Sequence, residues 1–164
     1  MGATSRVAVV TGAASGMGRA IAGHLAARGH RVALLDREGD AVLRAAAELR
    51  ETGASAIAAP ADVTDRGAVD AALAEVRAAL GPIAIMVTSA GLDAFESFTE
   101  ITAESWQRVL AVNLTGTFHC LQAAVPDMIA ARFGRMVTIS SSSAQAGGPG
   151  NADDFAAKKR GACL

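Results

Sequence analysis

The chain has 164 residues, a length that fits one domain with a sizeable core. Hydrophobic residues make up 51 % of it and charged residues 19 %, a balance that excludes a disordered chain. The formal net charge of −1 offers no basic excess for binding nucleic acid. No stretch reaches the ~18 apolar residues of a membrane span, and we expect no secretory signal at the start. With only two cysteines, the sequence predicts a cytoplasmic protein that binds neither nucleic acid nor a membrane.

Strand-like and helix-like segments alternate along the chain. Short apolar runs predict five strands, at residues 6–11, 31–36, 55–59, 83–87 and 136–139. Apolar residues at helical spacing predict the intervening helices, over about residues 16–28, 42–49, 69–80, 102–110 and 114–131. This order predicts an α/β fold in which helices cover both faces of a parallel sheet.

Apolar stripes on the first and last of these helices predict which side chains face the sheet. They are Met17, Ile21 and Leu25 in the first helix, and Phe118, Leu121, Val125 and Met128 in the last. Pro126 lies inside the last helix, where a proline is expected to kink the backbone.

A glycine-rich turn, residues 11–18, joins the first predicted strand to the first helix. Glycine lets the backbone approach a diphosphate closely, and the N-terminus of a helix has unpaired N–H groups and a dipole that favours anions. Because a strand precedes the turn and a helix comes after it, the turn predicts a dinucleotide site. The predicted contacts are Gly12, Ser15, Gly16, Met17 and Gly18. The alternative is a turn with only a packing role.

Asp36 ends the second predicted strand, 18 residues beyond Gly18. That is near the ~20 residues expected for the acid that binds the adenosine ribose. Its carboxylate can accept both ribose hydroxyls of NAD and would repel the 2′-phosphate of NADP, so we expect NAD as the cofactor. Arg37 argues for NADP, since a guanidinium binds that phosphate. The alternative is a solvated aspartate at a strand end.

The spacing Thr-Gly-x-x-x-Gly-x-Gly resembles the glycine motif of the short-chain dehydrogenase/reductase family. Residues 62–63 resemble the family's adenine-contacting Asp-Val pair, and residues 87–91 resemble its Asn-Asn-Ala-Gly signature. Thr88 and Ser89 replace the two asparagines of that signature. The resemblance implies further cofactor contacts at Asp62, Val63, Ala90 and Gly91.

Later stretches agree with the same family, and the resemblance extends from residue 6 to about residue 150. Residues 113–116 resemble its Asn-x-x-Gly, and residues 136–141 resemble its fifth strand with the catalytic serine. The resemblance implies a Rossmann-type doubly wound sheet, a nicotinamide cofactor, hydride transfer between a small alcohol and a carbonyl, and a homo-oligomer. It assigns catalytic roles to Asn113, Ser141 and Lys158, and Lys158 also holds the nicotinamide ribose.

The catalytic end departs from the family pattern, because the sequence contains no tyrosine. With Ser141 as the family's serine, the positions of its tyrosine and lysine fall on Asp154 and Lys158; in the register one residue later they fall on Phe155 and Lys159. An aspartate beside a lysine is ionised at neutral pH, and a phenylalanine has no proton to exchange. Neither replaces a phenol, so we expect catalysis to be impaired.

Residues 1–150 form the predicted dinucleotide-binding domain, and residues 151–164 form a short divergent tail. The last strands of the family fold, and most of a helix used in its oligomers, are expected to be missing. The sequence leaves three hypotheses open: an impaired NAD(P)-dependent oxidoreductase, a non-catalytic NAD-binding or interaction module, and a truncated or frame-shifted fragment of an active enzyme. The spacing of His24, His30 and His119 predicts no metal site.

Overall fold

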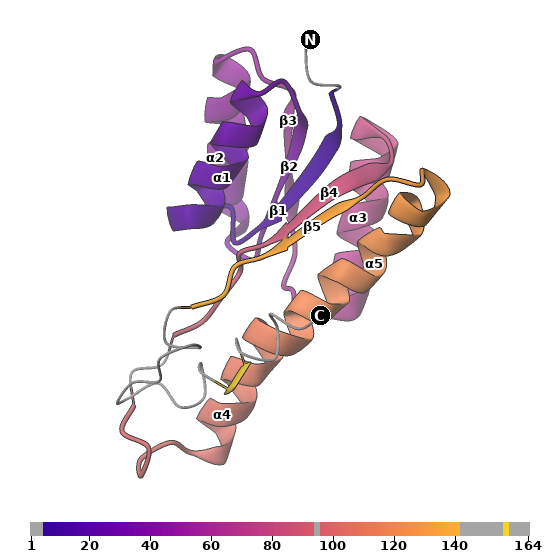
Figure 1. The fold of residues 1–164 in the computed structure, drawn as a ribbon. Coiled ribbons are helices and arrows are strands. Elements are labelled where there is room, and N and C mark those ends of the chain that lie inside the picture. Colours follow the sequence, from indigo (N-terminus) through magenta and orange to yellow (C-terminus); the bar gives the residue numbers. More distant parts are fainter. Residues whose placement is uncertain (1–4, 94–95, 142–155, 158–164) are drawn as a thin grey trace.

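The computed structural model describes residues 5–93, 96–141 and 156–157. Within these residues the strands form one parallel sheet in the order β3-β2-β1-β4-β5 (Figure 1). The strands are β1 (Val7–Thr11), β2 (Arg31–Asp36), β3 (Ala56–Pro60), β4 (Ile83–Thr88) and β5 (Arg135–Thr138). Each predicted strand is confirmed, with bounds that differ by one residue or less at either end.

Helices cover both faces of this sheet, as the alternating pattern predicts. They are α1 (Gly16–Ala27), α2 (Gly39–Glu51), α3 (Arg66–Leu80), α4 (Ala103–Leu110), the π-helix η1 (Ala111–Gly116) and α5 (Thr117–Ala130). The first two lie on one face, and α3 and α5 lie on the other (Figure 1). This is the doubly wound Rossmann-type architecture. None of the described helices is long and apolar enough to cross a membrane.

Alternate residues of the central strands supply the two halves of the core. In β1, Val7 and Val9 join the cluster under α3 and α5, whereas Val10 joins the cluster under α1 and α2. Successive side chains of a strand point to opposite faces, so a strand covered on both sides reads as a continuous apolar run. The order of the strands reverses between β1 and β4, and ligands of open α/β sheets bind at such a switch point.

The predicted inward faces of two helices need correction. In α1 only Met17 contradicts the prediction, at 64 % exposed, because Ile21 and Leu25 pack partly buried against the core. The most buried residues of α1 are Gly18, Ala22 and Ala26. In α5, Leu121 and Met128 are buried as predicted, but Phe118 is 43 % exposed and Val125 is only partly buried. In α1 the most buried positions hold small side chains, which let the helix axis lie close to the sheet. A prediction that looks only for large apolar side chains therefore misses the buried positions that alanine and glycine occupy.

Asp127 of α5 ties together α3, α5 and the start of β4. Its carboxylate accepts hydrogen bonds from Nε of Arg77, at 2.9 and 3.1 Å, and from the backbone N–H of Ile83, at 2.8 Å. The Arg77 guanidinium also donates to the carbonyl of Ala123 at 2.7 Å. A half-buried carboxylate with charged and backbone donors contributes more to stability than an exposed ion pair does.

We therefore expect Asp127→Ala to lower the free energy of unfolding by about 2 kcal/mol in urea titrations. The matched control is Asp70→Ala, which removes an exposed carboxylate that pairs with Arg66 on the same helix. That variant is expected to lose less than about 0.5 kcal/mol. Equal losses in the two variants would contradict the role given to Asp127.

Candidate nucleotide cleft

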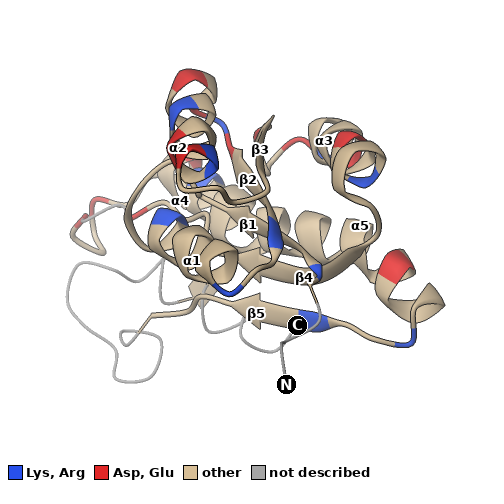
Figure 2. Ribbon diagram, turned by 90° about the horizontal axis from the view of Figure 1, so that it is seen from above, with Lys and Arg blue, Asp and Glu red and all other residues tan. Residues whose placement is uncertain are grey.

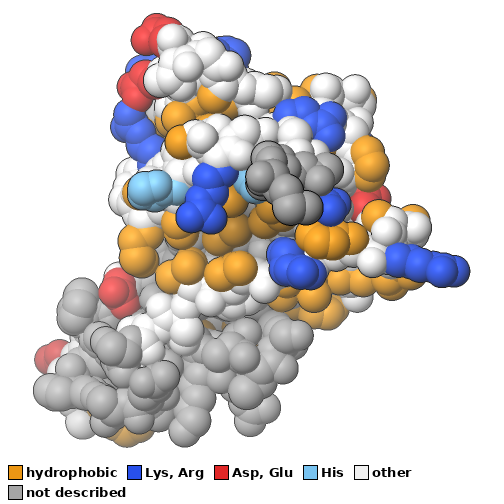
Figure 3. All heavy atoms as spheres, turned by 45° about the horizontal axis from the view of Figure 1, so that its top comes forward, with side chains coloured by type: hydrophobic (Ala, Val, Ile, Leu, Met, Phe, Trp, Pro, Cys, Tyr) orange, Lys and Arg blue, Asp and Glu red, His pale blue; other side chains and the backbone are white. Residues whose placement is uncertain are grey.

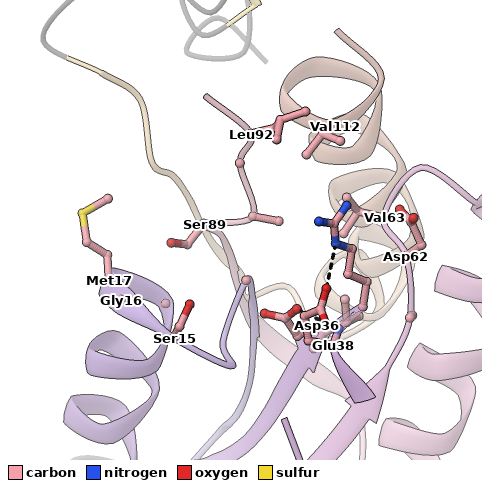
Figure 4. Close-up of a pocket in the computed structure, with 17 residues that line it drawn as sticks. Ser15, Gly16, Met17, Asp36, Glu38, Asp62, Val63, Ser89, Leu92 and Val112 are labelled. Atoms are coloured by element: carbon pink, nitrogen blue, oxygen red, sulfur yellow. Dashed lines mark hydrogen bonds and ion pairs between the residues drawn. The ribbon is translucent and has the colours of Figure 1, made fainter. Parts of the chain in front are cut away.

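A cleft of about 330 Å³ opens at the carboxyl ends of the strands, beside the switch point (Figure 4). The loops after β1, β2, β3 and β4 all contribute to its lining, together with one residue of η1. The lining residues are Gly12, Ser15, Gly16, Met17, Gly18, Leu35, Asp36, Arg37, Glu38, Ala61, Asp62, Val63, Ser89, Ala90, Gly91, Leu92 and Val112.

The loop after β1 fits against its neighbours only because it carries glycine. Gly12 has a φ of +66°, and a Cβ at this position would lie 2.8 Å from Cα of Ala90. A Cβ on Gly18 would collide with the carbonyl oxygen of Gly12. Gly12 and Gly18 therefore let the loop fold back between the start of α1 and the end of β4.

The N-terminus of α1 faces the cleft. Ser15 precedes the helix and makes no side-chain capping bond, and the backbone N–H groups of the first turn have no intrahelical acceptors. Gly16, with a φ of +54°, has no atom within 4 Å of the position where a Cβ would stand. The first turn of α1 therefore presents donors and the positive end of a helix dipole to open space.

Two backbone N–H groups hold the carboxylate of Asp36, at the end of β2, beside the loop after β1. Its Oδ2 accepts a hydrogen bond from the N–H of Ala14 at 3.0 Å, and its Oδ1 accepts one from the N–H of Glu38 at 3.1 Å. A carboxylate has about four lone-pair sites, so two bonds leave acceptor capacity directed at the cleft.

Asp62 and Val63 form the wall of the cleft after β3. Oδ1 of Asp62 accepts from both the N–H and the hydroxyl of Thr64, at 2.8 Å each, which fixes the turn that leads to α3. The carbonyl of Val63 lies 3.0 Å from Nδ1 of His119. A Cβ on Gly116 would come within 2.6 Å of Cγ2 of Val63, so glycine allows the helix to lie against this loop.

A buried hydroxyl holds the loop after β4 in place. Oγ1 of Thr11 accepts hydrogen bonds from the N–H of Ser89 at 3.1 Å and from the N–H of Ala90 at 3.0 Å. Thr88, which stands where the family has an asparagine, is also buried, but its Oγ1 has no hydrogen-bond partner in the described part of the chain. The support of this loop therefore comes from β1.

Asn113 lies in η1, next to the lining residue Val112, and its own side chain is buried. Its Oδ1 accepts from the N–H of Leu92 at 2.8 Å, and its Nδ2 donates to the carbonyl of Leu92 at 2.9 Å. The hydroxyl of Thr117 donates to the Asn113 carbonyl at 3.0 Å. The side chain thus fixes the backbone that continues the cleft after β4.

The predicted catalytic residues divide between described and undescribed parts of the chain. Ser141 lies just beyond β5, whose parallel pairing with β4 brings it to the same edge of the sheet as the cleft. Lys158 lies outside the described residues, as do Asp154, Phe155 and Lys159.

The ten described residues predicted to bind the cofactor all line this one cleft. The cleft has seven further lining residues that were not predicted as contacts: Leu35, Arg37, Glu38, Ala61, Ser89, Leu92 and Val112. Glu38 comes soon after the predicted acid in the chain, and its Oε1 lies 3.3 Å from Nε of Arg37. Leu92 and Val112 carry no chemical signal in the sequence, because only the fold brings them to the cleft.

Cys120 offers no nucleophile to the site. It is buried in α5, and burial raises the pKa of its thiol to about 12. The thiol therefore stays protonated at neutral pH.

Comparison with known proteins gives matches to one family. Residues 6–163 match the family described as short chain dehydrogenase. A 2-dehydro-3-deoxy-L-rhamnonate dehydrogenase (NAD(+)) of Sphingomonas sp. (strain SKA58) is 40 % identical over 157 residues, which cover 95 % of this chain and 61 % of that protein. A protein of Xanthobacter autotrophicus named inactive 2-(S)-hydroxypropyl-CoM dehydrogenase 2 is 42 % identical over 130 residues. These residues cover 79 % of this chain and 55 % of that protein.

Among solved structures, an actinorhodin polyketide ketoreductase variant with NADPH superposes with a TM-score of 0.91 at 33 % identity. The match covers 94 % of this chain and 60 % of the ketoreductase. The chain thus spans about three-fifths of the length of the proteins it resembles.

Thr11 and Thr88, both buried, give a matched test of how the cleft is built. We expect Thr11→Val to lower the free energy of unfolding by about 2 kcal/mol, because two partly buried N–H groups lose their acceptor. We expect Thr88→Val to cause no loss, since its hydroxyl has no partner to give up among the described residues. Urea titration measures both variants, and a larger loss in Thr88→Val would contradict this account of the loop.

Proposed function

The chain belongs to the short-chain dehydrogenase family, and we propose that it binds NAD in the cleft at the carboxyl edge of its sheet. One observation carries the proposal: the first turn of α1 and the Asp36 carboxylate open into the same cleft. The amide donors suit a diphosphate, and the carboxylate suits the two hydroxyls of a ribose. These are neighbouring parts of one dinucleotide.

The residues present fit such a ligand by shape as well as by charge. Gly12 and Gly18 bring backbone close to backbone, while the space in front of Gly16 is open. A helix N-terminus without a side-chain cap leaves its donors to a ligand. A packing role alone explains Gly12 and Gly18, but it does not explain why Gly16 faces open space.

The charges around the ribose end favour NAD over NADP. Asp36, Glu38 and Asp62 line this end of the cleft together with Arg37, so carboxylates outnumber the guanidinium. Arg37 also pairs with Glu38, although both side chains are exposed and such a pair is weak. A 2′-phosphate would meet an excess of negative charge here.

The reaction that this cleft would serve is that of an NAD-dependent oxidoreductase acting on a small alcohol or carbonyl compound. Bound nicotinamide supplies or accepts the hydride. Ser141, at the carboxyl end of β5, would donate a hydrogen bond to the substrate oxygen. Asn113 would act through its hold on the backbone of Leu92, and Lys158 would contact the nicotinamide ribose.

Turnover by this chain is expected to be slow, because no phenol is present to exchange a proton with the substrate oxygen. An unperturbed phenol titrates near ~10 and an aspartate near ~3.9, so Asp154 would be ionised where a proton donor is needed. Loss of one positioned general acid or base costs roughly 10²–10⁴-fold in rate.

A second candidate is a module that binds NAD without catalysis. The missing tyrosine favours it, and a relative 42 % identical over 130 residues is itself named inactive. Both candidates use the same cleft, so nucleotide binding supports either, and only turnover separates them.

We also propose that the protein acts in the cytoplasm and assembles into a homo-oligomer.

The first test concerns the ribose. We expect Asp36→Asn to weaken NADH binding about tenfold, which corresponds to about 1.4 kcal/mol. The affinity for NADPH should fall less than that for NADH, or rise, because the variant removes a negative charge near the 2′-phosphate. The amide oxygen can still accept from the N–H of Ala14, while the bond from the exposed N–H of Glu38 is lost. Isothermal titration with each nucleotide measures both affinities.

The control is Asp40→Asn, which removes an exposed acid from the first turn of α2, outside the cleft. Its NADH affinity should match that of the unmodified chain. Folded protein that binds neither nucleotide would refute the proposal, as would equal losses in the two variants.

The second test concerns turnover. With NADH and a panel of aldehydes and ketones, the expected rate is at least about a hundredfold below that of a family member that carries the tyrosine. Loss of NADH absorbance gives the rate. A rate comparable to that of the tyrosine-containing enzyme, and abolished by Ser141→Ala, would contradict the expected impairment.

A further inference from the structure

A histidine of α5 holds the wall of the nucleotide cleft from behind. Nδ1 of His119 lies 3.0 Å from the carbonyl oxygen of Val63. Val63 lines the cleft after β3, whereas His119 is not among the lining residues. Figure 2 shows α5 beside α3 on one face of the sheet, and the loop that carries Val63 leads from β3 into α3. The imidazole therefore reaches the wall without entering the cavity.

The chemistry of this contact decides which ring nitrogen carries a proton. A carbonyl oxygen only accepts hydrogen bonds, so Nδ1 of His119 must be the donor. The neutral ring is therefore the Nδ1–H tautomer, whose Nε2 keeps its lone pair. The imidazolium ion also donates from Nδ1, so the bond to Val63 forms with either state of the ring.

The backbone around Val63 has few other restraints. The N–H of Ala61 donates to the carbonyl of Asp36 at 3.0 Å, which ties the start of the loop to β2. The N–H of Asp65 donates to the carbonyl of Asp62 at 3.1 Å, which closes a turn before α3. Within the described ranges no backbone N–H bonds to the Val63 carbonyl. His119 is thus the donor that fixes the middle of this loop.

The side chain of Val63 rests on the same stretch of the chain as its carbonyl does. It is buried in the core cluster that includes Cys120 and Leu121 of α5. A Cβ on Gly116 would come within 2.6 Å of Cγ2 of Val63. The segment 116–121 therefore supports the wall twice, through packing and through the imidazole. Only the imidazole acts on the backbone of the loop.

Val63 lies where the base of a bound dinucleotide would fall. In the proposed site the diphosphate lies beside β1 and the ribose lies at Asp36, at the end of β2. The next strand in the sheet is β3, so the base continues toward the loop after β3. Ala61, Asp62 and Val63 line the cleft there, and Figure 4 shows the last two across the cleft from Met17. An aliphatic side chain at this place offers an apolar surface to the base.

We propose that His119 is a positioning residue of the nucleotide cleft, one that sets the place of the Val63 wall by donating from Nδ1 to its carbonyl. The inference rests on the proposed nucleotide site, and it adds to that site a residue that does not touch the ligand. The part of the ligand that depends on His119 is the base, because the diphosphate and the ribose are bound by other loops.

The test compares two variants with two probes. His119→Leu removes the donor, whereas His119→Asn keeps an N–H group at the same number of bonds from the backbone. NADH extends to the Val63 wall, and reduced nicotinamide mononucleotide (NMNH) lacks the adenosine that would reach it. We expect His119→Leu to weaken NADH binding about fivefold and to leave NMNH binding unchanged, and we expect His119→Asn to recover most of the loss. Isothermal titration measures NADH, and NMR titration measures the weaker NMNH.

The control is His24→Leu, which removes an exposed histidine of α1 that does not line the cleft. Histidine is a surface residue elsewhere in this chain, as the pale blue imidazole groups in Figure 3 show. His24→Leu should keep the NADH affinity of the unmodified chain.

The outcomes separate this inference from the proposed site. If His119→Leu weakens NADH and NMNH equally, the residue supports the fold in general and the inference is overturned. It is also overturned if the unmodified chain binds NADH and His119→Leu binds it as tightly. An unmodified chain that is folded and binds no NADH would refute the nucleotide site itself, and the inference with it.

A second measurement needs neither a nucleotide nor a variant. Long-range correlation of ring protons with ring nitrogens, in isotope-labelled protein, shows which nitrogen of each histidine carries the proton. We expect the neutral ring of His119 to be protonated at Nδ1. A neutral ring protonated at Nε2 would overturn the inference, because Nδ1 could then not donate to Val63.

Discussion

The candidate site depends on one close approach, between the backbone that leaves β1 and the backbone that leaves β4. Gly12 allows the contact, since a Cβ there would stand 2.8 Å from Cα of Ala90. Thr11 fixes it, because its buried hydroxyl accepts the N–H groups of Ser89 and Ala90. With these loops joined, the cleft has a continuous floor at the switch point of the sheet, and the first turn of α1 faces into it. The same contact explains why replacing the two asparagines of the family signature leaves the loop supported.

Binding and catalysis depend on different parts of this chain. The residues that would hold a dinucleotide come from the carboxyl ends of β1 to β4 and the loops after them. The residues that would move a proton belong to the segment after β5, and the sequence contains no tyrosine there. A mutation that removes a phenol leaves the glycine turn and Asp36 untouched. Nucleotide affinity can therefore persist in a chain whose turnover is lost, because binding and proton transfer use different residues.

Much of the fold could be predicted from the sequence, because buried parallel strands are short apolar runs and their order along the chain is simple. The cleft was predictable for a related reason: the glycines, Asp36 and the Asp62-Val63 pair are local signals tied to strand ends. The rest depends on tertiary contacts. In α1 the predicted Ile21 and Leu25 pack against the core, but the most buried positions are held by the small Ala22 and Ala26, and Met17 is exposed. Asn113 matches a motif, but its bonds to Leu92 depend on the π-helix that places it there.

The central claim is that the amides at the start of α1 and the carboxylate of Asp36 bind one dinucleotide. Backbone amide NMR of isotope-labelled protein during an NADH titration tests it most directly. The account predicts that the largest shift changes fall on the amides of Gly16, Met17 and Gly18, and on that of Ala14, which is bonded to Asp36. Saturable changes centred elsewhere, for example on the loop between α5 and β5, would contradict it, and so would a folded chain whose amides do not respond to NADH at all.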